Sequence, residues 1–168
     1  DIFKLRGLFV TTNADTHFDR LFDPPYIFYR ASDFKADSLA ILQLYHIHGS
    51  VKDRYSLIFT VSEYMKRYTD PEFNRFLGKI FREYTVLFLG YGVAEFEILD
   101  FILKDNPRNQ ALTPKHFMLS PFYKGEENIL RYEQAYYNDL NINILGYEKD
   151  TNRYDQLIEV IRFWNDEI

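Results

Sequence analysis

The chain has 168 residues and a mass of 20.2 kDa, a size typical of one domain of roughly 100–200 residues. Hydrophobic residues make up 46% of the chain and aromatic residues 18%, which is enough for a core and excludes a disordered tail. The net charge of −5 excludes a globally basic nucleic-acid-binding surface, and the lack of cysteine excludes disulfides, thiolate zinc sites and cysteine catalysis. No apolar run approaches the roughly 18 residues that cross a membrane, and no signal peptide opens the chain, so we expect a cytoplasmic protein.

Short apolar runs rich in β-branched and aromatic residues predict the strands. Several of these runs are apolar at consecutive positions, which is typical of strands buried on both faces of a parallel sheet. The predicted strands cover residues 8–12, 44–47, 56–60, 85–89, 116–119 and 142–145.

Segments with apolar residues at spacings of three and four predict the helices. They cover residues 62–68, 71–84, 95–103, 126–137 and 154–163, and the aperiodic stretch 22–38 is predicted as a long loop. Strands that alternate with helices indicate βαβ units. We therefore predict an α/β fold, Rossmann-like, with a mainly parallel sheet and helices on both faces.

Three predicted strands end in polar or glycine-bearing motifs. Thr12 ends the first strand and Asn13 and Asp15 follow it, His48 follows the second, and Gly90-Tyr91-Gly92 follows the strand at 85–89. Ligands of open α/β sheets bind beyond the carboxyl ends of the strands, so these motifs are the candidate site.

Each motif also has an ordinary structural explanation. Asn13 and Asp15 are residue types that cap turns, because their side chains bond to nearby backbone amides. A histidine before a glycine is often only hydrogen-bonded at a strand end. The pair Gly90 and Gly92 often makes nothing more than a tight turn.

The remaining histidines are weaker candidates. His46 and His48 alternate along one strand and face the same side, so His46 either supports His48 or is simply packed, and packing is favoured. No third ligand accompanies this pair, so no metal site is expected. His17, with Asp19 and Arg20, is predicted to begin a solvent-facing helix, and His116 is predicted to be structural.

In order along the chain, TTNAD, IHGS and GYG resemble the motifs of a sirtuin-like domain, and more narrowly of the NAD-hydrolysing type in bacterial antiviral-defence proteins. The segments LIFTVSEYMKRY and GYGVAEFEILDFIL support this resemblance, which runs from about Leu8 to the C-terminus.

The resemblance implies a role for each motif. Asn13 would lie beside the nicotinamide ribose and orient the attacking water, Asp15 would lie near the nicotinamide carboxamide, and His48 would be the general base. Gly90 and Gly92 would approach the adenosine and phosphates, and Thr12 and Tyr91 complete the NAD-binding set.

The implied function is hydrolysis of NAD⁺ to nicotinamide and ADP-ribose by the effector domain of a defence protein. NAD would be the substrate, no metal would be needed, and the partners would be sensor or effector domains, with a homo-oligomer also open. The alternatives are an NAD-dependent protein deacylase and a non-catalytic module that binds NAD or ADP-ribose. A deacylase normally carries a four-cysteine zinc module, and this chain has no cysteine.

The start of the chain bears on NAD binding. The chain opens at Asp1 without Met, and Gly7 is the only glycine before Gly49. The glycine-rich strand and loop that cradle the NAD phosphates in sirtuins therefore have no counterpart here. We expect residues 1–168 to be a single sirtuin-like domain cut from a longer protein, and to bind NAD weakly alone.

Overall fold

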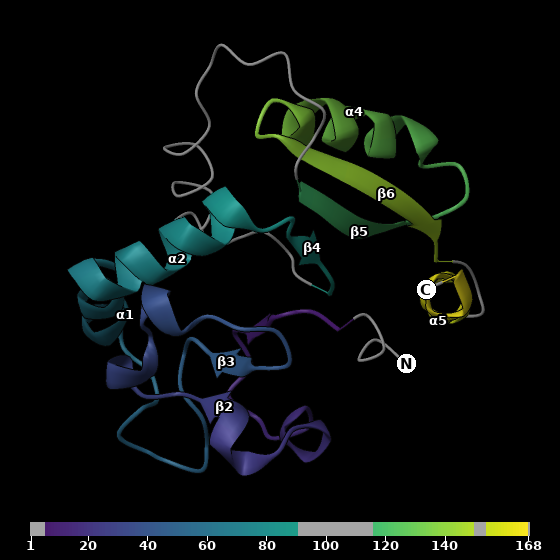
Figure 1. Cartoon of the computed structure of the whole chain (residues 1–168). Helices are drawn as coiled ribbons and strands as arrows, with labels where there is room; N and C mark the ends of the chain where they lie inside the picture. Colours follow the sequence, from purple (N-terminus) through teal and green to yellow (C-terminus); the bar gives the residue numbers. More distant parts are fainter. Residues whose placement is uncertain (1–5, 91–115, 150–153, 168) are drawn as a thin grey trace. The chain divides into compact units, whose positions relative to one another are not determined.

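A computed structural model describes residues 6–90, 116–149 and 154–167 of the chain (Figure 1). These residues form an α/β fold in which all paired strands run parallel, as the sequence predicts. The chain divides between Lys79 and Ile80 into two compact units, and each unit is described by itself.

The N-terminal unit contains a three-stranded parallel sheet. Its strands are β1 (Phe9–Thr11), β2 (Ile27–Phe28) and β3 (Leu44–His46), in the order β1-β3-β2. The central strand β3 is buried at every position, as expected for a strand covered on both faces. Thr11 pairs with His46, so β1 and β3 end side by side.

Two helices and an aromatic core complete this unit. The helices are α1 (Val61–Tyr68) and α2 (Pro71–Glu83), of which residues 71–79 belong to this unit. Phe76 of α2 is fully buried, with its ring 5.0 Å from the ring of Tyr45 and 5.4 Å from that of Phe34. Stacked and tilted ring pairs of this kind stabilise a core beyond their buried area.

The C-terminal unit contains a second three-stranded parallel sheet. Its strands are β4 (Leu87–Phe88), β5 (His116–Phe122) and β6 (Ile142–Glu148), in the order β4-β5-β6. Helix α4 (Glu127–Asn138) runs along β6 (Figure 1). Helix α5 (Asp155–Glu167) follows β6 in the chain. Gly146 permits this packing, because a Cβ there would lie 2.5 Å from the side chain of Leu130. Within the described ranges, no helix is long and apolar enough to span a bilayer.

Most predicted elements that fall on described residues are confirmed. The expected helix at 95–103 lies outside the described residues. The predicted loop at 22–38 contains β2 and three single-turn 3₁₀ helices, η3 (Pro24–Tyr26), η4 (Ala31–Asp33) and η5 (Ala36–Ser38).

The predicted strand at 56–60 is wrong. The Ser56 hydroxyl donates to the Asp53 carbonyl at 2.6 Å, and the Ile58 amide donates to the His48 carbonyl at 3.1 Å. Thr60 is already the N-cap of α1. The polar atoms of this apolar run are therefore bonded in a turn, to the backbone of His48 and in a helix cap rather than in a strand ladder.

Candidate functional site

Two loops meet at the carboxyl end of the N-terminal sheet. The loop after β1 carries Asn13, and the loop after β3 carries His48. The Ile47 amide donates to the Thr11 carbonyl at 3.0 Å, and the Val51 amide donates to the Ala14 carbonyl at 2.9 Å. These bonds continue the β1–β3 pairing, so Asn13 and His48 lie at one edge of one sheet, where ligands of α/β folds bind.

The backbone of Asn13 is held at both polar atoms. Its amide donates to Thr11 Oγ1 at 3.1 Å, and its carbonyl lies 2.9 Å from His46 Nδ1. Residue 13 is nevertheless exposed, while Thr12 is half-buried. A fixed main chain with an exposed amide side chain is suited to orienting a water or a hydroxyl group.

Asp15 lies on the same loop and has a structural task. Its Oδ1 accepts a hydrogen bond from the His17 amide at 2.9 Å, which is an Asx turn. Asp15 therefore stabilises a turn, as its residue type predicts, and any contact with a ligand would be a second role.

His48 is half-buried against two tyrosines of α1. Its Nε2 lies 3.0 Å from the Tyr68 hydroxyl, and its ring lies edge-on to Tyr64 and Tyr68 with centroids 5.6 and 6.0 Å away. Tyr64 and Tyr68 are four residues apart, so they share one face of α1. The sequence analysis did not identify them as site residues, although the spacing in the segment SEYMKRY was the available signal.

Gly49 shapes the turn that follows His48. Its φ is +85°, and a Cβ built on it would lie 2.2 Å from the Ser56 carbonyl oxygen. Only glycine combines this conformation with so close an approach of the backbone.

Arg67 supports the same loop from α1. Its Nη1 donates to the Ile47 carbonyl at 2.7 Å, and its guanidinium lies over the ring of Phe34 at 4.7 Å. Burial lowers the pKa of Arg67 below its ordinary value. An arginine remains cationic under these conditions, so it provides a cation–π contact and a charged donor to the peptide that precedes His48.

His46 and Asp19 form a buried pair beneath the two loops. His46 is fully buried, and its Nε2 lies 2.9 Å from Asp19 Oδ1. Lys52 Nζ lies 2.7 Å from the other carboxylate oxygen, Oδ2. The burial expected of a packed His46 is confirmed, and in addition both of its ring nitrogens have polar partners.

The solvent-facing position expected for Asp19 is wrong. Asp19 opens the 3₁₀ helix η2 (Asp19–Leu21), but the side chain of His46 draws it inward and it is only 5% exposed. His17, the other residue expected in that segment, is exposed.

The third motif belongs to the C-terminal unit. Gly90 follows β4, is exposed and has a φ of +62°, a conformation that favours glycine. Tyr91 and Gly92 lie outside the described residues. In the same unit, His116 is buried and its Nδ1 accepts from the Val86 amide at 3.2 Å, so its structural role is confirmed.

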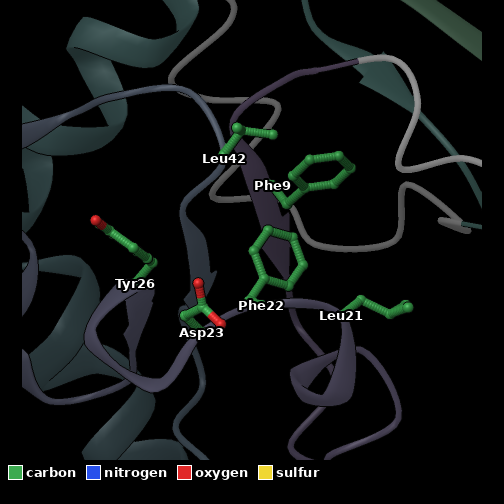
Figure 2. Close-up of a pocket in the computed structure, with 6 residues that line it drawn as sticks. All are labelled: Phe9, Leu21, Phe22, Asp23, Tyr26 and Leu42. Atoms are coloured by element: carbon green, nitrogen blue, oxygen red, sulfur yellow. The ribbon is translucent and has the colours of Figure 1, made fainter.

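An apolar pocket lies at the opposite end of the N-terminal sheet. Figure 2 shows the rings of Phe9 and Phe22 side by side with Leu42 beyond them. Phe9 is the first residue of β1, and the Leu42 amide bonds to the Gly7 carbonyl just before β3 begins. This pocket, lined also by Leu21, Asp23 and Tyr26, is therefore at the amino ends of the strands and separate from the loops that carry Asn13 and His48.

The chain is similar in sequence to a known protein family. The family model described as SIR2-like domain matches residues 7–145, from just before β1 into β6. The chain belongs to the SIR2-like domain family. No curated protein matches it. The predicted sirtuin-like domain is thus confirmed, and membership in this family associates the chain with NAD-related chemistry and NAD binding.

Proposed function

We propose that this SIR2-like protein hydrolyses NAD⁺ to nicotinamide and ADP-ribose, with Asn13 and His48 as the catalytic residues. One observation carries the proposal: the loops with Asn13 and His48 follow two adjacent parallel strands whose last residues, Thr11 and His46, are paired. An amide and an imidazole at one sheet edge are the two groups that this hydrolysis needs.

The chemistry follows from the substrate. When the bond between the ribose C1′ and the nicotinamide nitrogen breaks, the cationic nicotinamide takes the bonding electrons and leaves as a neutral molecule. The ribose then has oxocarbenium character, and fixed polar groups stabilise that developing charge. Asn13 orients a water toward C1′, the water oxygen forms the new bond, and His48 accepts its proton.

The tyrosines of α1 suit His48 to this task. The Tyr68 hydroxyl at Nε2 fixes the direction of the imidazole ring, and the ring edges of Tyr64 and Tyr68 limit its rotation. A general base works best when its orientation is set before substrate binds.

The rest of NAD would be held by the other proposed residues. Asp15 would lie near the nicotinamide carboxamide, the loop of Gly90, Tyr91 and Gly92 would approach the adenosine and phosphates, and Thr12 would also contact NAD. Residues 1–168 would then act as one sirtuin-like domain, in the setting of antiviral defence and under control of partner domains, as the TTNAD, IHGS and GYG motifs suggest.

The test is NAD turnover by the full-length protein and by the variants Asn13→Ala and His48→Ala. Acid–base groups contribute about 10²–10⁴-fold, so each variant should lose at least about 10²-fold in kcat. Arg75→Ala, which removes an exposed ion pair with Asp37, is the control and should keep wild-type turnover.

The competing functions give different results in the same assay. Turnover of NAD only when an acylated peptide is added would indicate a deacylase, and NAD binding without turnover would indicate a binding module. Either result, or near wild-type rates in both alanine variants, would contradict the proposal.

A further inference from the structure

His46 is a buried ionisable residue for which the proposed reaction has no use. It ends β3, it has no exposed surface, and both ring nitrogens have partners: the Asn13 carbonyl oxygen at Nδ1 and Asp19 Oδ1 at Nε2, each at 2.9 Å. The ring therefore joins the loop after β1 to the buried carboxylate of Asp19.

Hydrogen-bond accounting determines where the hydrogens lie. A carbonyl oxygen only accepts, so Nδ1 must carry a hydrogen toward Asn13. At the other side, the ammonium of Lys52 at 2.7 Å favours an ionised Asp19, and an ionised carboxylate also only accepts. In this arrangement both ring nitrogens of His46 donate, and the imidazolium, carboxylate and ammonium groups form a continuous charged row.

In such a row, the charged His46 ring restrains the position of the Asn13 carbonyl. Hydrogen bonds from a charged donor are shorter and stronger than neutral ones, and removing one member of a buried ionic group leaves another without its partner. Because the Asn13 amide is also bonded to Thr11 Oγ1, both sides of residue 13 are tied to the sheet.

We propose that His46 is a positioning residue for Asn13: supported by Asp19 and Lys52, it holds the Asn13 carbonyl so that the side-chain amide stays at the reacting ribose. This inference rests on the proposed function. A misplacement of a catalytic group by about 1 Å can cost roughly 10²-fold in rate, so loss of the hydrogen bond should lower kcat without removing any group that touches NAD.

Two variants of His46 distinguish the hydrogen bond to Asn13 from the hydrogen bond to Asp19. In His46→Asn, the shorter amide places its NH₂ near the position of Nδ1 and can still donate to Asn13. In His46→Gln, the longer amide reaches the position of Nε2 and contacts Asp19 instead. Both variants remove the imidazolium, so both should lower the melting temperature.

The expected results differ between these variants. His46→Asn should keep kcat within a few-fold of wild type, whereas His46→Gln should lose about 10–10²-fold in kcat with little change in KM. His116→Asn removes a similarly buried histidine of the C-terminal unit and should be destabilised with an unchanged kcat. Equal kcat values for His46→Asn and His46→Gln would overturn the inference.

A measurement on the wild-type protein keeps the test independent of activity and of variant folding. NMR of the protein with labelled histidine should show a hydrogen on both ring nitrogens of His46 and a scalar coupling from Nδ1 to the Asn13 carbonyl carbon. A neutral ring, or no coupling to Asn13, overturns the inference whatever the turnover. Failure of the wild-type protein to cleave NAD would contradict the proposed function instead and would leave these signals unchanged.

Discussion

Gly49 is the residue on which the conformation after His48 most directly depends. Replacing it with alanine forces a side chain into a φ of +85° and brings a Cβ to 2.2 Å from the Ser56 carbonyl oxygen. The unusual conformation alone costs of order 1–3 kcal/mol. We expect Gly49→Ala to lower the free energy of unfolding by more than that amount and to reduce NAD turnover, because the backbone of His48 must move.

A second glycine variant separates the cost of the positive φ from the cost of the steric clash with Ser56. Gly125 has a φ of +94°, and none of the described atoms lies within 4 Å of a Cβ built there, so Gly125→Ala carries only the conformational cost. Urea unfolding of the two variants measures the difference. Equal losses of stability would show that the Ser56 carbonyl moves aside easily and that the turn is not closely packed.

At the scale of the element, α1 is the helix that faces the candidate site. Residues of one helix face, Tyr64, Arg67 and Tyr68, contact His48 or the peptide before it. The helix starts in a capping box: Thr60 Oγ1 accepts from the Glu63 amide, and Glu63 Oε2 accepts from the amides of Phe59 and Thr60 at 3.0 and 2.9 Å. The start of α1 therefore depends on the charge of Glu63.

This dependence gives a prediction in pH. The amide of Phe59, then the amide and hydroxyl of Thr60, hold the pKa of Glu63 below its ordinary value of 4.5. Because the pKa is lower in the folded state, the carboxylate stabilises the fold above the unfolded-state pKa, and this contribution is lost as pH falls toward the folded-state value. We expect Glu63→Gln to lower the melting temperature at pH 7, with the difference from wild type vanishing in acid.

The control for this experiment is another glutamate in the first turn of a helix. Glu72 of α2 is exposed and its carboxylate lies 3.8 Å from Arg75, a distance at which a surface pair contributes little. Glu72→Gln should follow the wild-type melting curve across the pH range. A wild-type-like melting temperature for Glu63→Gln at pH 7 would contradict the importance of the capping box.

At the scale of the whole molecule, the chemistry of the chain predicts independence from divalent metals. The sequence has no cysteine and four histidines, and the described parts of the chain contain no group of three or more histidine, aspartate or glutamate side chains placed to hold an ion. We expect a chelator to change neither the melting temperature nor NAD turnover. Stoichiometric metal in the purified protein, lost together with activity on chelation and restored by zinc, would contradict this.

Local patterns were sufficient for most of the fold. The periodicity of α2 is strong because Phe73, Phe76, Leu77 and Ile80 repeat at spacings of three and four and are all buried. The strands β5 and β6 follow from consecutive apolar residues that a two-sided core requires. These patterns predict secondary structure because each helix or strand must place its own apolar residues on the side that is buried.

The same patterns failed where partners distant in sequence decide the outcome. Residues 56–60 have the composition of a strand, yet the Ile58 amide donates to the carbonyl of His48 in the loop after β3 instead of to a neighbouring strand. The pair Ile27 and Phe28 is too short to show a period, and it becomes β2 only because β3 offers an edge to pair with. Asp19 resembles a solvent-facing helix start until His46 is placed opposite it.

For this protein, the sequence by itself determined the α/β class, the parallel arrangement and the strand ends that carry Asn13 and His48, because these follow from residue type and local period. Only the tertiary structure decided that the tyrosines of α1 face His48 and that the buried pair of His46 and Asp19 meets the exposed Lys52. The reason is physical: a hydrogen bond between residues 27 positions apart in the chain, as in His46 and Asp19, depends on how strands and loops meet, and no local pattern encodes it.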